Sequence, residues 1–166
     1  MLFDINESQR HARERLTRVS RRRRRSDAGR SRLPEVVLSE LRAAALGDDR
    51  PSMAALQRLV SERCLSAGLK PPVRASLYNA LARLDGHVYA VATLPPPVVE
   101  ALYNIAPDAR VPGHQLAFYC FNYGSLGAIS HAAGLPWLDL YQARRMRGWR
   151  PRSFGLLKAV MRTRGL

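Results

Sequence analysis

Cysteine and lysine are both scarce in this sequence, and their scarcity limits the classes of protein to which it can belong. The 166 residues include two cysteines, Cys64 and Cys120, and no CxxC pair. Both lie in apolar helical patterns, so we expect buried thiols in a reducing cytoplasm rather than a disulfide framework. Only Lys70 and Lys158 of the 27 basic residues are lysines. Arginine suits planar, bidentate contacts with phosphates and base edges, although a GC-rich genome would produce the same bias.

Long apolar runs are missing as well. No stretch of 18 apolar residues occurs, and the first residues, MLFDINESQRHARERL, lack the apolar core of a signal peptide. We therefore expect a cytoplasmic, nucleoid-associated protein with no membrane partner.

The sequence also lacks a pattern typical of catalysis. Its four histidines are scattered, without HxxxH spacing or paired cysteines, so we expect no metal and no cofactor. Ser130 and His131 are neighbours on a predicted helix and point in different directions, so they do not make a nucleophile and base. Asp48 and Asp49 invite comparison with nuclease carboxylates, but a loop with a helix cap explains them more simply. We expect a protein that is not an enzyme.

Positive charge is abundant, and it is concentrated at the two ends of the chain. The formal net charge is +14. Residues 1–33 carry 11 arginines against four acids, and residues 141–166 carry eight basic residues and no acid. Residues 34–140 are nearly neutral, with eight basic and nine acidic residues. This distribution favours a polyanionic partner such as DNA or RNA over a uniformly solvated surface.

The N-terminal segment 1–33 is predicted to be a flexible arginine-rich arm. Five consecutive arginines repel one another in the free chain, and they are expected to contact phosphates or a minor groove. These residues are Arg21, Arg22, Arg23, Arg24 and Arg25. A solubilising tail is the alternative interpretation.

Residues 34–94 are predicted to form three helices and a strand. Pro34 opens the first helix, Ser52 caps the second, and the third spans residues 73–84. The apolar positions expected to face inward on the second and third helices are Leu56, Leu59, Val60, Cys64, Val73, Leu77, Leu81 and Leu84. HVYAVATL, at 87–94, has the composition of a strand.

This order of three helices and a strand resembles a winged-helix domain. The resemblance implies that helix 72–84 enters a DNA major groove. The side chains that would then lie nearest the bases and phosphates are Arg74, Ser76, Asn79 and Arg83.

The second half of the chain is predicted to contain a linker and another helical domain. Residues 95–113 start with three prolines, then a short helix, and end in a loop. The stretch HQLAFYCFNYG, from His114 onward, is apolar nearly all round and is expected to be a buried helix, central to residues 114–166 or part of a dimer interface.

Residues 125–148, SLGAISHAAGLPWLDLYQARRMRG, are predicted to be two short helices joined at Gly134. Gly134 is expected to end the first helix with a positive φ, and Pro136 to begin the second. The segment resembles a helix-turn-helix motif, which implies a second recognition helix followed by a phosphate-binding tail. The residues expected to contact DNA here are Trp137, Gln142, Arg144, Arg145, Arg147, Arg150 and Arg152.

These features predict a mainly α protein with a winged-helix-like domain and a C-terminal helix-turn-helix-like domain. The expected function is sequence-specific binding of double-stranded DNA as a transcriptional regulator of bacterial type, as a homodimer. Two alternatives stay open. One is an antitoxin or adaptor that docks a protein partner through the proline run and 114–123 and regulates its own synthesis through its DNA-binding motif. The other is an RNA-binding protein, because arginine-rich arms also order on RNA.

Overall fold

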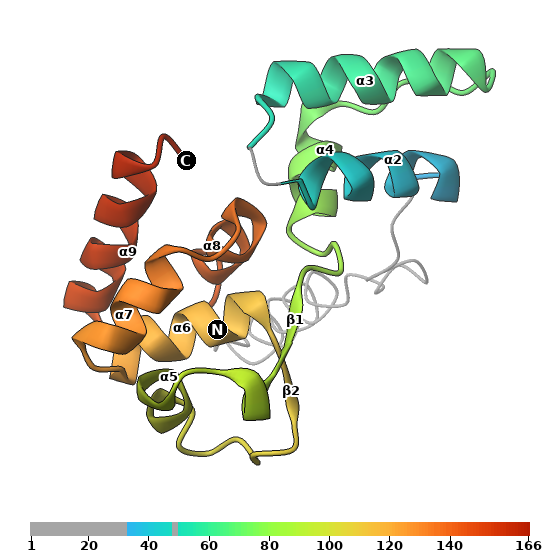
Figure 1. The fold of residues 1–166 in the computed structure, drawn as a ribbon. Helices are drawn as coiled ribbons and strands as arrows, with labels where there is room; N and C mark the ends of the chain where they lie inside the picture. The colour runs from blue at the N-terminus through green and yellow to red at the C-terminus, as the bar shows by residue number, and fades with distance from the viewer. Residues whose placement is uncertain (1–32, 48–49) are drawn as a thin grey trace, which may run out of the picture. The chain divides into compact units, whose positions relative to one another are not determined.

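The computed structural model describes residues 33–47 and 50–166, and Leu33–Leu166 forms one compact unit (Figure 1). The predicted arm up to residue 32 and the pair Asp48-Asp49 lie outside the described residues. The described part is mainly helical, as predicted, with one small antiparallel sheet. Its elements run in the order α2 (Glu35–Ala45), α3 (Met53–Ser66), α4 (Arg74–Leu81), β1 (Val88–Ala90), a 3-10 turn (Val91–Thr93), α5 (Pro96–Ala101), β2 (Arg110–Pro112), α6 (Gly113–Tyr123), α7 (Leu126–Ala133), α8 (Trp137–Ala143) and α9 (Pro151–Thr163).

Helices α2, α3 and α4 pack their apolar stripes against one another. The predicted cap of α3 is confirmed, because the Ser52 hydroxyl accepts a hydrogen bond from the Ala55 N–H at 3.1 Å. Two predicted inward positions are wrong. Leu59 is 40% exposed because the buried stripe of α3 runs instead through positions 53, 56, 60 and 64. Val73 is 67% exposed because it precedes the first turn of α4 and does not share its buried face.

The predicted strand at 87–94 is shorter than expected, and its partner lies in a segment predicted to be a loop. β1 pairs with β2 in antiparallel register, with Tyr89 opposite Val111. Beyond Ala90 the chain turns into the 3-10 helix, and the prolines that follow cannot donate to a strand ladder. The two strands are therefore joined by the 3-10 turn, α5 and a loop rather than by a tight turn.

The second core forms around α6. Leu116, Ala117 and Cys120 are fully buried there against α5, α7, α8 and α9. The sequence predicted a helix buried nearly all round, and this prediction is confirmed. Most of the helix is covered by its own chain, and of the segment 114–123 predicted to dock a protein partner, Tyr123 is 40% exposed and Tyr119 is half-buried.

Helix α8 belongs to both cores. Leu140 and Ala143 lie in the core around α6, whereas Trp137 and Leu138 lie in the core of α2–α4. The predicted domain boundaries at 94–95 and 113–114 stay predictions. None of the helices in the described ranges combines the length and the apolar character that a membrane span requires.

Candidate nucleic-acid interface

The side chains that were predicted to read DNA lie on α4 and in the turn that follows it. Arg74, Asn79 and Arg83 are exposed, and Ser76 is half-buried, while Leu77 and Leu81 hold the opposite face in the core. The guanidinium of Arg74 lies 5.8 Å from the ring centroid of Tyr78, a cation–π distance. Packing of Leu77 and Leu81 in the core thus leaves Arg74, Asn79 and Arg83 exposed on α4 and the turn after it.

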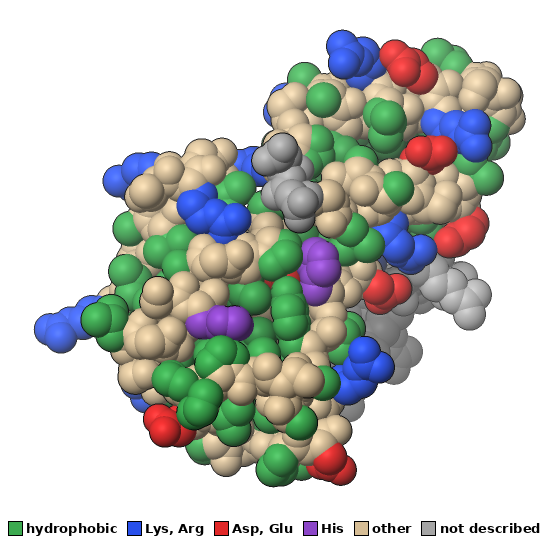
Figure 2. Space-filling model, in the orientation of Figure 1, with side chains coloured by type: hydrophobic (Ala, Val, Ile, Leu, Met, Phe, Trp, Pro, Cys, Tyr) green, Lys and Arg blue, Asp and Glu red, His purple; other side chains and the backbone are tan. Residues whose placement is uncertain are grey.

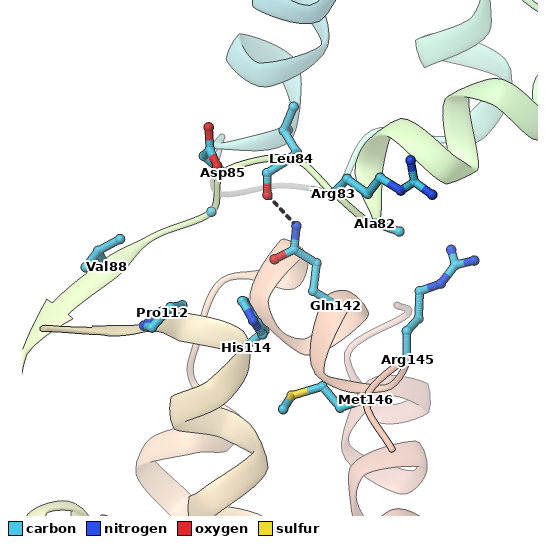
Figure 3. A pocket seen from close by; sticks show the side chains of 11 residues that line it. Ala82, Arg83, Leu84, Asp85, Val88, Pro112, His114, Gln142, Arg145 and Met146 are labelled. Carbon is cyan, nitrogen blue, oxygen red and sulfur yellow. Dashed lines mark hydrogen bonds between the residues drawn. The ribbon is translucent and has the colours of Figure 1, made fainter. Parts of the chain in front are cut away.

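An arginine from the C-terminal half lies against this helix. Arg145 Nη1 donates to the Tyr78 carbonyl at 3.3 Å and to the Tyr141 hydroxyl at 2.7 Å. Its guanidinium also lies 5.5 Å from the Tyr141 ring centroid. Arg83 and Arg145 line the same pocket, where both side chains extend to one side (Figure 3). Arg74 and Arg145 therefore both contact Tyr78, and Arg83 shares a pocket with Arg145.

Two predicted DNA contacts are wrong, because α8 is not an exposed recognition helix. Trp137 is 3% exposed and packs in the core of α2–α4. Gln142 is 6% exposed, and its Nε2 donates to the carbonyls of Leu81 at 2.9 Å and Leu84 at 2.8 Å. Lying between two cores, α8 keeps only Tyr141 partly open to solvent. The turn before it also differs, since Gly134 has a φ of −85° rather than a positive value.

The remaining predicted arginines, Arg144, Arg147, Arg150 and Arg152, are exposed. Arg150 is held in place, with Nη1 donating to the Asn122 carbonyl at 3.0 Å and the guanidinium 4.6 Å from the Tyr123 ring centroid. In Figure 2 the basic side chains over α9 have no acidic side chain among them, as expected from a segment without acids.

Next to this interface lies a buried polar cluster that the sequence interpretation missed. Asp139 on α8 is fully buried; its Oδ2 accepts from the Tyr89 hydroxyl at 3.2 Å and lies 3.2 Å from His87 Nδ1. Burial raises the pKa of Asp139, and the neighbouring His87 opposes that rise. Burial and the Asp139 charge likewise raise the pKa of Tyr89. A Cβ on Gly113 would collide with the Asp139 carboxylate, so α6 begins with the one residue that fits there.

No family model, curated protein or solved structure matches the chain. Its function therefore rests on the chemistry of the side chains described above.

The buried cluster joins parts of the fold rather than forming a reaction centre. Asp139 is closed to solvent, so no substrate reaches its carboxylate. The cluster connects β1 to α8 across 50 positions of sequence. One sequence signal for the cluster is the aspartate in the first turn of α8, where the helix dipole favours an acidic side chain. Within the described residues, no three His, Cys, Asp or Glu side chains are placed to hold a metal ion.

The exposed arginines offer a different chemistry. Guanidinium groups bind phosphate oxygens in pairs and read guanine edges, and an asparagine amide matches the edge of adenine. The face around α4 therefore combines groups suited to a nucleic-acid backbone with groups suited to its bases.

Proposed function

We propose that the protein is a sequence-specific, double-stranded-DNA-binding regulator of bacterial type that places α4 in the major groove. The observation that carries the proposal is the set of exposed arginines on and beside α4, next to the exposed amide of Asn79. Arg74 and Arg145 both contact Tyr78, and Arg145 shares a pocket with Arg83. Asn79 is proposed to read an adenine, and the arginines to contact guanines or phosphates.

The charge distribution supports this proposal. Arg144 precedes Arg145, Arg147 follows it two positions later, and both are exposed. Residues 141–166 carry eight basic side chains and no acid. Neutralising DNA phosphates with such side chains releases counterions, so affinity is expected to fall steeply as salt rises. The predicted arm, Arg21–Arg25, is proposed to add further phosphate contacts.

The arrangement around α4 also fits the winged-helix resemblance. Three packed helices precede the strand, and β1 and β2 form a two-stranded antiparallel ribbon after the recognition helix, where a wing is expected. The long connection between the strands is the departure from that arrangement. The helix-turn-helix resemblance of α7 and α8 gives no second reader, because α8 is buried.

Selection from a random duplex pool, followed by sequencing of the bound fraction, tests the proposal. We expect an enriched motif that contains adenine, and an inverted repeat if the protein binds as a homodimer. Asn79→Ala should relax the preference at one base pair by about 1–3 kcal/mol. The matched control is Asn104→Ala, which removes an exposed amide far along the chain and should leave the motif intact. Strong binding without any motif would contradict a sequence-specific reader.

A second function, docking of a protein partner, is favoured by one exposed surface. Tyr103 is 69% exposed, and its ring lies 5.6 Å from that of Tyr123 and 6.3 Å from that of Tyr119. Arg150 lies over Tyr123. Tyrosine and arginine are the residues enriched at protein interfaces, so this surface is where an adaptor partner would bind. Loss of a co-purifying partner in Tyr103→Ser would support docking here, and its retention would argue against it.

A further inference from the structure

A pocket lies beside α4, at the point where the two cores approach each other (Figure 3). Its volume is about 400 Å³, within the range of small-molecule sites. Its walls come from the turn after α4, from β1 and the start of α6, and from α8 and the turn that follows. Val88, Pro112 and Met146 supply apolar surface.

A buried acceptor without a partner faces this pocket. Both protons of Gln142 Nε2 are used on the Leu81 and Leu84 carbonyls, which fixes the orientation of the amide. Gln142 Oε1 has no hydrogen-bond partner among the described residues, although the side chain is 6% exposed. In Figure 3 this oxygen is turned towards the side of the pocket that holds Pro112 and His114. An unpaired buried acceptor is costly, so the site favours a ligand that donates an N–H there.

Gly86 lies against this buried acceptor and has no side chain to crowd it. A Cβ at position 86 would lie 3.2 Å from Gln142 Oε1 and 3.1 Å from Asp139 Oδ1, closer than ordinary contact. Asp139 Oδ1 is also a buried oxygen without a hydrogen-bond partner in the described part of the chain. A glycine is thus placed where a Cβ would crowd two buried oxygens that have no partner in the described part of the chain.

The opposite side of the pocket is cationic. Arg83 and Arg145 both line it and are exposed at its rim. Arg145 Nη1 donates to the Tyr78 carbonyl and the Tyr141 hydroxyl, and the other N–H groups of the guanidinium can bind an anion. Asp85, also at the rim, lies 3.6 Å from Arg42, which offsets its charge.

We propose that this pocket binds a free nucleotide whose base carries an exocyclic amino group. The amino group donates to Gln142 Oε1, the base lies against Val88, Pro112 and Met146, and the phosphate lies between Arg83 and Arg145. The three requirements are an N–H donor, an apolar body and an anionic end, and such a nucleotide supplies all of them within the size of the pocket.

Because Arg83 and Arg145 also belong to the proposed DNA interface, the nucleotide and DNA compete for them. This competition rests on the proposed function, whereas nucleotide binding does not. A bound nucleotide would therefore act as an effector that releases DNA from α4.

Calorimetric titration of the full-length protein with adenosine monophosphate, in the absence of DNA, tests the binding. Inosine monophosphate is the matched ligand, because it replaces the 6-amino group with a carbonyl. We expect inosine monophosphate to bind about tenfold more weakly or worse, since a site that hydrogen-bonds a donor rejects an analogue lacking it. Equal binding of the two nucleotides, or no heat with either at millimolar concentration, would overturn the proposal.

Two variants and a control locate the site. Gly86→Ala should weaken adenosine monophosphate binding about tenfold or more, because its Cβ would crowd Gln142 Oε1. Arg83→Ala should do so by removing a phosphate ligand. Arg83 is exposed, so its removal leaves the core intact and keeps the test valid even where Gly86→Ala fails to fold. Arg110→Ala removes an exposed arginine of β2 outside the pocket and should bind as the wild type does. Unchanged binding in Arg83→Ala would overturn the assignment.

A third experiment compares a free nucleotide with a base that is part of a single strand. If single-stranded oligoadenylate binds and adenosine monophosphate does not, the free-nucleotide proposal is wrong. Competition is then measured with labelled duplex DNA, which adenosine monophosphate should displace more effectively than inosine monophosphate. Failure of duplex binding would count against the proposed function alone, because the calorimetric result does not depend on DNA.

Discussion

At the scale of single residues, the side chains that matter most for the fold are two buried polar groups on α8. Gln142 donates to the last carbonyls of α4 and of the turn beyond it, so it ties α4 to α8. Asp139 ties β1 to α8, because its carboxylate contacts Tyr89 on β1 and His87 just before it. The exposed residues proposed to contact DNA lie on elements that these buried hydrogen bonds hold in place.

Gln142→Leu is expected to destabilise the fold by about 1–3 kcal/mol. The leucine fills a similar volume but leaves the Leu81 and Leu84 carbonyls without their donor. Chemical denaturation measures the change in the free energy of unfolding. Gln57→Leu, at a half-buried position of α3, is the control and should change stability much less. Equal effects at the two positions would show that the two hydrogen bonds contribute little.

Asp139→Asn is expected to change how stability depends on pH. Burial raises the folded pKa of Asp139 above its ordinary value of 3.8, so the folded state binds a proton that the unfolded state has lost. The wild type should therefore lose stability, relative to the asparagine variant, as pH rises from 3.8 through the folded pKa. The size is about 1.4 kcal/mol for each unit of raised pKa. Chemical denaturation of both proteins between pH 4 and pH 7 gives the free energy of unfolding of the variant minus that of the wild type, which should grow with pH. If it stays constant or falls, the interaction of Asp139 with His87 offsets or outweighs the effect of burial.

At the scale of elements, α8 is the helix that the two cores share. Its seven residues are buried except for Tyr141, and it packs against α6 as well as against the core of α2–α4. A short helix of this kind positions other elements rather than reading DNA itself. Helix α4, by contrast, has Arg74 and Asn79 exposed.

Leu138→Ala is expected to cost about 2–5 kcal/mol, as for other fully buried leucines. The location of the destabilised helices is more informative than the size of the loss. Because Leu138 lies in the core of α2–α4, hydrogen exchange should speed up in those three helices as well as in α8. Leu157→Ala is the matched variant, since Leu157 is as deeply buried but lies in the core around α6. If both variants expose the same amides to the same degree, α8 does not join two separate cores.

The sequence was sufficient to predict elements that depend on local pattern. Apolar spacing predicted α2, α3 and α4, a serine predicted the cap of α3, and an all-round apolar run predicted a buried α6. Features set by contacts distant in sequence were missed. The ribbon joins Tyr89 to Val111, and the polar cluster joins His87 to Asp139. The apolar Trp137 and Leu138 were a signal that α8 is buried, but a seven-residue helix does not show by its spacing which neighbours cover it.

At the scale of the whole molecule, the positive charge and the residues proposed to read DNA lie in different parts of the chain. The formal charge of +14 is concentrated in the segments 1–33 and 141–166, while α4 lies in the nearly neutral middle. Arg145 brings the basic C-terminal segment to α4 through its bond to the Tyr78 carbonyl. In the proposed function, the ends of the chain supply affinity for any DNA, and the face around α4 supplies the choice of sequence.

The central claim is that duplex DNA binds the face around α4, and the salt dependence of affinity tests it most directly. Fluorescence anisotropy of a labelled duplex would be measured with the wild type and with the triple variant Arg74→Ala, Arg83→Ala, Arg145→Ala. The control triple is Arg50→Ala, Arg58→Ala, Arg110→Ala, at exposed positions outside the basic ends of the chain. Each lost phosphate contact reduces the slope of log affinity against log salt by about 0.9. We predict a slope shallower by about 2–3 and a large loss of affinity in the first triple variant, with a smaller change in the control. Equal slopes for the two triple variants would contradict the account.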